Sequence, residues 1–331
     1  MKSQFHSTIA GLLMMAAAAM PGSLAAATLE GHDGRVWALD HSPDGRLLLS
    51  GSADGTARLW DMEKSATLAV LKPHDGRVRS VAFAPDGKRA ATGDYGGVIR
   101  LWSVPDGRLL RTIQAHGEVV RDLAISPDGS RIATSSYDMT ARLWEASSGK
   151  RIATLTGHTD TVNTVAFSPN GEVIATGSGS VFNPPPDYSI RLWDGRTGKP
   201  LGTLSGHDDN VREIQFSPDG TLLASGSDDR TVRLWDVDAK SVAQTFRGHR
   251  SDIPGVAFIG NGCVVSVSYD ETVRFWLRAA SAESETARVF DQHTDEVWAV
   301  SVAADGSVAT SDASGVIRLW QRTQLPAGCR S

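Results

Sequence analysis

Alternating apolar and polar positions form three short runs between Gly206 and Asp236. The runs read VREIQF, TLLASG and TVRLWD, and the turns between them read SPDG and SDDR. A period of two, bounded by Ser, Asp, Gly and Pro, predicts three antiparallel strands joined by tight turns. A unit of this size cannot bury its two apolar faces alone, so it needs copies of itself beside it.

Copies of this unit fill most of the chain, each opening with a His and closing with a Trp. Most His-to-His steps are 42 residues long, with one of 49 and one of 44. The seven opening residues are His32, His74, His116, His158, His207, His249 and His293. The seven closing residues are Trp60, Trp102, Trp144, Trp193, Trp235, Trp276 and Trp320.

A repeat with this period and with Gly-His and Trp-Asp ends resembles the WD40 family. The resemblance covers residues 29 to 320. It implies an all-β fold, a seven-bladed β-propeller with four strands in each blade. It also implies that the N-terminal strand, Thr28 to Gly31, joins the last blade and closes the ring.

The resemblance further implies a buried hydrogen-bond network in each blade. In it, the opening His bonds an Asp in the turn after the second strand, and the pair reaches a Ser or Thr and the indole N–H of the closing Trp. Buried polar groups need such partners. The pattern predicts five complete networks: His32, Ser50, Asp54 and Trp60; His116, Thr134, Asp138 and Trp144; His158, Thr176, Asp187 and Trp193; His207, Ser225, Asp229 and Trp235; His249, Ser266, Asp270 and Trp276.

The second and seventh blades depart from this pattern at the Asp. Gly96 and Ser314 stand where the other blades carry Asp, and Asp94 and Asp312 lie two residues earlier. We therefore expect altered networks in these two blades.

Composition and motifs point away from catalysis. A net charge of −5 gives no reason to expect binding to nucleic acid or to an anionic membrane. Seven of the nine histidines belong to the repeats, His6 lies in the leader, and His41 occupies an ordinary strand position. No serine-hydrolase, zinc-protease or haem-attachment motif occurs. We expect no catalytic residue, no metal and no cofactor, and so no enzyme.

The first 27 residues have the form of a secretory signal peptide. Lys2 precedes an apolar run, Ile9 to Met20, and Ala25-Ala26-Ala27 fits a cleavage site. Residues 28–331 are then a single propeller that is periplasmic or secreted, of a bacterial type, with no membrane insertion after signal removal.

The two cysteines are either free thiols or partners in a disulfide. Cys263 sits at a strand position that Leu222 fills in the repeat from Gly206, which favours a buried thiol. A disulfide between Cys263 and Cys329 is the alternative, because both could lie near the same end of neighbouring blades in an oxidising compartment.

One position in each repeat varies while the frame stays fixed. It lies five residues after the opening His, near the start of the inner strand and beside the channel mouth, and it often contacts partners in WD40 proteins. Here it carries Trp37, Arg79, Arg121, Asn163, Arg212, Pro254 and Trp298.

The tyrosines gather on the same face. Three of the four stand seven residues before a closing Trp, and the fourth lies in an inserted turn: Tyr95, Tyr137, Tyr269 and Tyr188. Trp, Tyr and Arg dominate binding hot spots. We therefore expect the four tyrosines, together with Trp37, Trp298, Arg79, Arg121, Asn163 and Arg212, to bind a partner with acidic and apolar character. The alternative is that Tyr merely suits this turn and spread by repeat copying.

The fourth repeat carries an insertion, residues 180–186, that includes three prolines. It is either a tolerated surface loop or a finger that contacts a ligand. The sequence as a whole predicts a monomeric ring that acts as a non-catalytic scaffold for a protein or peptide of unknown identity. The alternative is an accessory of a periplasmic enzyme or electron-transfer system that docks a redox protein or a small ligand at the channel mouth.

Overall fold

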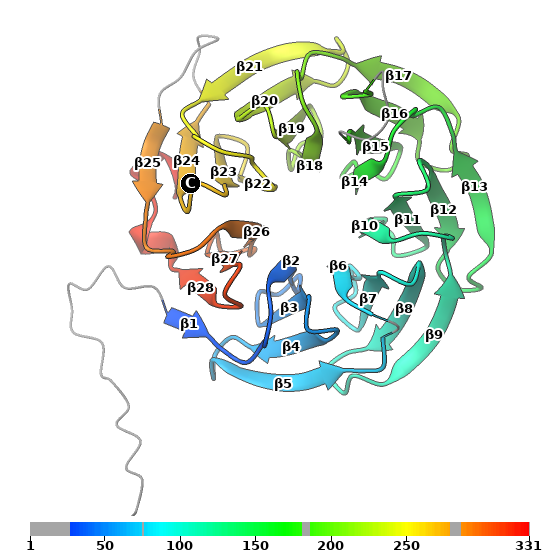
Figure 1. The fold of residues 1–331 in the computed structure, drawn as a ribbon, viewed down its shortest axis with the longest axis horizontal. Coiled ribbons are helices and arrows are strands. Elements are labelled where there is room, and N and C mark those ends of the chain that lie inside the picture. The colour runs from blue at the N-terminus through cyan, green and yellow to red at the C-terminus, as the bar shows by residue number, and fades with distance from the viewer. Residues whose placement is uncertain (1–26, 75, 181–185, 279–285, 331) are drawn as a thin grey trace, which may run out of the picture.

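Seven four-stranded antiparallel sheets stand around a central channel in the computed structural model of the chain (Figure 1). The structure describes residues 27–74, 76–180, 186–278 and 286–330. Each sheet is one blade, with one edge strand at the channel and the other at the rim. The predicted seven-bladed all-β propeller is confirmed.

The strands follow the chain from the innermost to the outermost position in blades 1 to 6. Blades 1 to 3 consist of β2 (Val36–His41), β3 (Leu47–Ser52), β4 (Ala57–Asp61) and β5 (Ala66–Leu71); β6 (Val78–Phe83), β7 (Arg89–Asp94), β8 (Val98–Ser103) and β9 (Leu109–Gln114); β10 (Val120–Ile125), β11 (Arg131–Ser136), β12 (Ala141–Glu145) and β13 (Arg151–Leu155). Blades 4 to 6 consist of β14 (Val162–Phe167), β15 (Val173–Ser178), β16 (Ile190–Asp194) and β17 (Pro200–Leu204); β18 (Val211–Phe216), β19 (Leu222–Ser227), β20 (Thr231–Asp236) and β21 (Ser241–Arg247); β22 (Gly255–Ile259), β23 (Cys263–Val267), β24 (Val273–Leu277) and β25 (Thr286–Phe290).

Blade 7 joins the two ends of the chain. It contains β26 (Val297–Val302), β27 (Val308–Asp312), β28 (Ile317–Trp320) and, outermost, β1 (Ala27–Leu29). The register pairs Thr28 with Arg318 and buries Leu29 at 1% exposure. The predicted closing strand is thus confirmed, although it begins one residue earlier and ends at Leu29. Of the predicted signal peptide, residues 1–26 lie outside the described residues.

The core lies between blades, which explains why one repeat needs its neighbours. Trp60 of blade 1 packs with Leu29, Ala299 and Ile317 of blade 7. Trp102 of blade 2 packs in the same way on apolar residues of blade 1. Each interface buries the alternating apolar side chains of both blades, so closing the ring leaves no blade face open.

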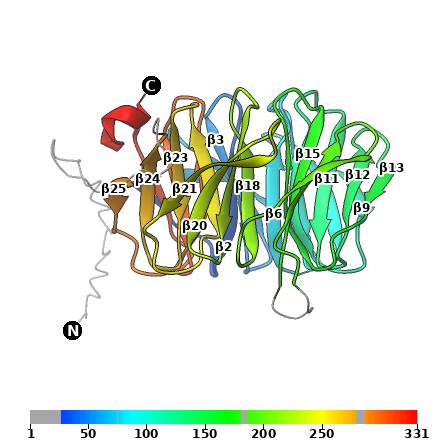
Figure 2. The same cartoon turned by 90° about the horizontal axis from the view of Figure 1, so that it is seen from above.

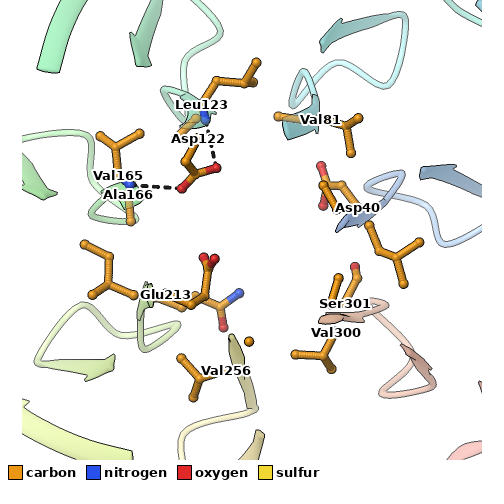
Figure 3. A pocket seen from close by; sticks show the side chains of 18 of the residues that line it. Asp40, Val81, Asp122, Leu123, Val165, Ala166, Glu213, Val256, Val300 and Ser301 are labelled. Atoms are coloured by element: carbon orange, nitrogen blue, oxygen red, sulfur yellow. Dashed lines mark hydrogen bonds between the residues drawn. The ribbon is translucent and has the colours of Figure 1, made fainter. Parts of the chain in front are cut away.

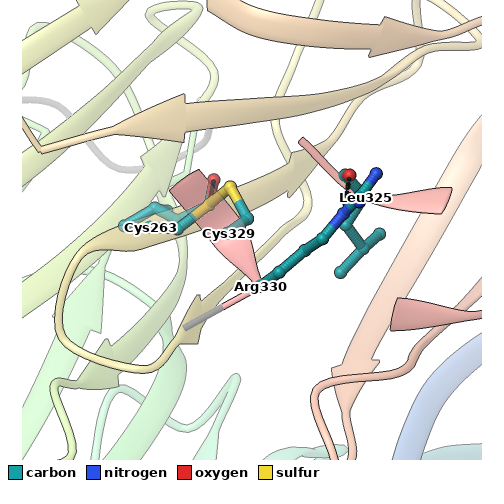
Figure 4. Close-up of a disulfide and its surroundings, with 5 residues drawn as sticks. Cys263, Leu325, Cys329 and Arg330 are labelled. Atoms are coloured by element: carbon teal, nitrogen blue, oxygen red, sulfur yellow. Dashed lines mark hydrogen bonds between the residues drawn. A yellow bond between two sulfur atoms is a disulfide. The ribbon is translucent and has the colours of Figure 1, made fainter. Parts of the chain in front are cut away.

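The C-terminal segment returns to blade 6 through two short 3-10 helices, η1 (Arg322–Gln324) and η2 (Ala327–Cys329). Cys329 forms a disulfide with Cys263 at the start of β23, and both side chains are 1% exposed (Figure 4). The favoured interpretation of Cys263 as a free thiol is wrong, because η2 brings the two Cα atoms to 5.2 Å. Among the described residues, no helix is long and apolar enough to cross a membrane.

The two faces of the ring differ in what they carry. The inner strands begin on one face, and the turns between the second and third strands of each blade lie there too. We call it the His-loop face, because the loops with the repeat histidines lead into these strands. The C-terminal 3-10 helices lie at the opposite face, as the side view shows (Figure 2).

Candidate functional site

A hydrogen-bond network fixes the His-loop face in each predicted blade. In blade 5, His207 Nδ1 lies 2.6 Å from Asp229 Oδ2, and its Nε2 lies 2.7 Å from Ser225 Oγ. The Trp235 indole donates to the same hydroxyl at 2.8 Å. The equivalent bonds join the residues expected in blades 1, 3, 4 and 6. The network ties the His loop to the turn and to the blade beneath it.

The network of blade 5 holds a neutral imidazole beside a carboxylate. Burial lowers the pKa of His207, although Asp229 opposes the shift. Burial alone would raise the pKa of Asp229, but hydrogen bonds from His207 and Thr231 bring it below its usual range. The pair is therefore a structural hydrogen bond at neutral pH.

Blades 2 and 7 differ from each other, although their sequences depart in the same way. In blade 7, Asp312 lies 2.8 Å from His293 Nδ1, so the network is complete and the expectation of an altered one is wrong. In blade 2, Asp94 instead forms a buried ion pair with Arg100 and accepts the backbone N–H of Val98. Only blade 2 therefore shows the expected change.

The predicted aromatic residues form two Trp–Tyr pairs across blade boundaries. Trp37 of blade 1 stacks on Tyr95 of blade 2 with ring centroids 5.4 Å apart. Trp298 of blade 7 lies 4.4 Å from Tyr269 of blade 6. We call these four residues the aromatic arc. The two tryptophans sit on adjacent blades, 1 and 7. Trp37 pairs with a Tyr of blade 2 and Trp298 with a Tyr of blade 6, so the two pairs extend in opposite directions around the ring.

Arginines cover the aromatic arc. The Arg35 guanidinium carbon lies 4.4 Å from the Trp298 ring, and those of Arg77 and Arg79 lie 5.9 and 5.8 Å from the Trp37 ring. Burial and the charge of Arg121 lower the pKa of Arg79 to about 10, which leaves it charged at neutral pH. Sequence reasoning missed Arg35 and Arg77, although both lie three residues after a repeat His.

The remaining candidates are engaged within the chain. Arg121 and Asn163 are 5% and 4% exposed, and the Arg121 Nε donates to the Asn163 amide oxygen at 3.3 Å. Arg121 also lies 5.6 Å from the Tyr137 ring. The Arg212 Nε donates to Asp228 at 2.7 Å. The role expected for Arg212, pairing with a partner's carboxylate, is thus already filled by this chain.

Tyr188 is the last of the predicted contact residues. Its side chain is half-buried, and burial together with the charges of Asp209, Asp160 and Asp228 raises its pKa. Its hydroxyl therefore lies near an acidic part of the face. Residues 181–185 of the insertion, and with them the predicted finger, lie outside the described residues.

Carboxylates line the channel below the mouth, in a cavity of about 340 Å³ (Figure 3). Asp122 accepts the Val165 N–H at 2.9 Å, and Asp40 accepts the Phe83 N–H at 2.7 Å. Burial raises the pKa of Asp40 to about 7, against the effect of the Phe83 bond. Burial also raises the pKa of Glu213 well above its usual value, and the nearby Asp122 adds to the effect.

Some of these channel side chains accept hydrogen bonds from the free edge of an inner strand. An inner strand has no strand partner toward the channel, so its backbone N–H groups need other acceptors. Asp40 and Asp122 supply them to the next blade, and the hydroxyl of Thr164 does the same for Ile214 at 3.2 Å. Sequence reasoning missed this, although Asp40 stands where blades 2, 3 and 4 carry Ala. Nowhere in the described ranges do three His, Cys, Asp or Glu converge as a metal site would require.

Comparison with known proteins finds the repeat throughout the chain. The family described as WD domain, G-beta repeat matches residues 25–61, 65–103, 107–145, 149–194, 198–236, 240–276 and 284–321. Eukaryotic translation initiation factor 3 subunit I of Phaeosphaeria nodorum is 44% identical over 41 residues, 12% of each chain. The protein of the same description from Aspergillus niger is 47% identical over 36 residues, 11% of each chain. The chain thus spans about an eighth of these relatives, close to one repeat.

Proposed function

The chain belongs to the WD40 family, and on that premise we propose that it is a non-catalytic scaffold that binds a protein or peptide on its His-loop face. The observation that carries the proposal is the aromatic arc with the guanidinium groups of Arg35, Arg77 and Arg79 over its rings. Aromatic and arginine side chains supply most of the binding energy at protein interfaces. The acidic side chains of a partner segment would pair with the arginines, and its apolar side chains would pack on the half-buried rings of Tyr95, Tyr269 and Trp298. Trp37 is only 8% exposed and supports Tyr95 from below.

Other features agree with a scaffold role. Each repeat His bonds a Ser or Thr of its own blade, as His74 does with Thr92 at 2.9 Å. The same hydroxyl accepts the indole N–H of the closing Trp, which supports a structural role for these histidines. The interfaces between blades already bury the faces of each repeat, which supports a monomeric ring.

We place the protein in the periplasm or outside the cell, with residues 1–27 as its signal peptide. Support comes from the leader-like sequence and from the disulfide between Cys263 and Cys329. Disulfides persist in oxidising compartments and are rare in the cytosol.

Affinity capture from an extract of exported proteins tests the scaffold role. The bait is residues 28–331, beside a double variant in the arc, Arg77→Ala with Tyr95→Ala. The control removes one Arg and one apolar residue elsewhere, Arg46→Ala with Leu68→Ala, which are well exposed. All three proteins must melt alike.

We expect a partner that the parent and the control retain and the arc variant loses. A partner held equally by all three would remove the arc from the interface, and no partner for the parent would count against a scaffold. A captured protein with visible absorbance would favour the accessory role for a periplasmic enzyme or electron-transfer system, with a redox protein or small ligand docked at the channel mouth.

A further inference from the structure

A second hollow lies on the His-loop face, next to the Tyr269 end of the aromatic arc, where the backbone N–H of Tyr269 donates to the backbone carbonyl of Asp252 at 3.1 Å. Its volume is about 480 Å³, and loops of blades 3 to 6 line it. The residues that define its chemistry are Tyr137, Asp209, Asn210, Arg212, Asp228 and Asp252. We call it the acidic pocket.

Negative charge is in excess in the acidic pocket. The lining includes three carboxylates, Asp209, Asp228 and Asp252, and one guanidinium, that of Arg212, which Asp228 already binds. Arg121 stands behind the lining residues Tyr137 and Asn163. Asp252 lies 3.9 Å from Arg212, at the limit of an ion pair. Burial and the neighbouring Asp228 raise the pKa of Asp252 to about 6. The charge of Arg212 opposes this shift without cancelling it.

Asn210 adds an unused acceptor. It is 6% exposed, and its amide Nδ2 donates to Asp228 Oδ2 at 2.8 Å. This bond fixes the amide, since the flipped form would turn its carbonyl oxygen toward a carboxylate. The carbonyl oxygen Oδ1 is buried and accepts no hydrogen bond from any residue that the structure describes. A buried acceptor without a donor costs about 1–3 kcal/mol, so a donor there would be favoured.

Small and aromatic residues shape the pocket. A Cβ at Gly179 would stand 2.6 Å from both the Cα and the Oδ1 of Asn210, so a larger residue there would clash with this acceptor. Gly179 also has φ +146°, which other residues rarely adopt. Tyr137 lines the rim and is 39% exposed, so part of its ring is open to a ligand.

We propose that the acidic pocket binds a cationic side chain of the partner, the ammonium of a lysine or the guanidinium of an arginine. The proposal deepens the scaffold role and rests on it. Both groups carry only donors and a positive charge, which match the Asn210 oxygen and the carboxylates of Asp209 and Asp252. The Tyr137 ring, beside which Arg121 already lies, would pack against the alkyl stem.

Direct binding of small probes tests the pocket without the partner. The probes are Nα-acetyl-argininamide, Nα-acetyl-lysinamide and the neutral isostere Nα-acetyl-citrullinamide, measured by calorimetry or ligand-observed NMR at low salt. The variants are Asp252→Asn and Asp209→Asn. The matched control is Asp208→Asn, which removes the same charge at a side chain that is 90% exposed.

We expect both cationic probes to bind more tightly than citrullinamide. Each pocket variant should weaken them by roughly tenfold, the scale of one nearby charge, and the control by less than about twofold. Equal binding of citrullinamide, unchanged binding to both pocket variants, or no binding of the cationic probes would overturn the proposal.

The experiments distinguish a failure of the acidic-pocket proposal from a failure of the proposed scaffold role. The arc variant, Arg77→Ala with Tyr95→Ala, should bind the cationic probes like the parent, because its residues lie outside the acidic pocket. Loss of the captured partner in that variant alone would uphold the scaffold role even if the probes failed to bind.

Discussion

Acid should weaken the junction between the first and last blades through His41. This residue ends β2 and is 7% exposed. Its Nδ1 lies 2.9 Å from the hydroxyl of Ser301 in β26, and its backbone N–H donates to the same oxygen at 3.1 Å. Since that oxygen accepts from the backbone, its O–H is free to donate to a neutral imidazole. A protonated ring would have no acceptor role and would remain buried.

The size of the effect follows from the pKa of His41. Burial lowers it from 6.5 to about 4, and only Asp305 opposes the shift. The folded state therefore binds fewer protons than the unfolded state between these values. The stabilisation is fully present above about pH 6.5 and is lost as the pH falls toward about 4. At about 1.4 kcal/mol per pH unit, the interval corresponds to about 3 kcal/mol.

Urea unfolding of the parent and of His41→Gln, followed from about pH 7.5 to about pH 4, measures this loss. The variant keeps a neutral group that can accept from Ser301 but does not titrate. We expect the parent to lose about 3 kcal/mol more than the variant over this range. His116, His207, His249 and His293, whose pKa values burial also lowers, titrate in both proteins and cancel in the difference.

Parallel stability curves for the parent and His41→Gln would refute the reasoning. So would an NMR titration of the parent that places the pKa of His41 near 6.5, because the burial of the ring would then have no effect on its proton.

Three further predictions concern stability. Cys329→Ser should lower the free energy of unfolding by about 4 kcal/mol, because the disulfide closes a loop of 66 residues; reduction of the parent in a urea titration should reproduce the loss. Deletion of Thr28–Glu30 should lower the melting temperature, since it removes two of the three residues of β1 that pair with β28; an unchanged value would contradict ring closure by this strand. Asp229→Ala should cost about 1–3 kcal/mol by leaving a buried imidazole unpaired, whereas Asp208→Ala should change stability by less than about 0.5 kcal/mol in the same assay.

The sequence predicts the blades well because their determinants are local. Alternation, turn residues and the His and Trp markers all lie within one repeat, and the period adds the neighbours. Which residues pair with each other within a blade is harder to predict from the sequence. Blades 2 and 7 carry their Asp at the same offset and an Arg at the same place, yet Asp94 pairs with Arg100 and Asp312 with His293. The spacing of residues in the sequence does not show whether the Arg or the His of a blade pairs with its Asp.

Contacts between repeats were harder still to foresee. The sequence places Trp37 and Trp298 at the channel mouth and the tyrosines in the turns of the same face. The stacking of Trp37 on Tyr95 depends on the distance between loops of different blades, which no spacing within a repeat encodes. Arg212 shows the same limit, because its partner Asp228 lies in a turn of its own blade that the sequence pattern assigned only to structure.

The channel shows how an inner-strand acid can be structural. Asp40 and Asp122 occupy a cavity and have raised pKa values, two features that often mark a functional site. Both, however, accept backbone N–H groups of the next blade, which have no other strand to bond. Replacing either by Ala would leave such a donor buried, so these acids hold neighbouring blades together.

Recognition is better placed at the rim, where charge is unevenly divided. The net charge of −5 is not spread evenly over the His-loop face, which has a basic part and an acidic part. Over blades 7, 1 and 2, arginines lie across aromatic rings, whereas three carboxylates and one arginine that is already bound line the acidic pocket. A partner with an acidic, apolar segment and a basic side chain would match both sides in one orientation only. Complementarity of this kind fixes the register of a complex more than its affinity, because a reversed partner would place like charges together on both sides.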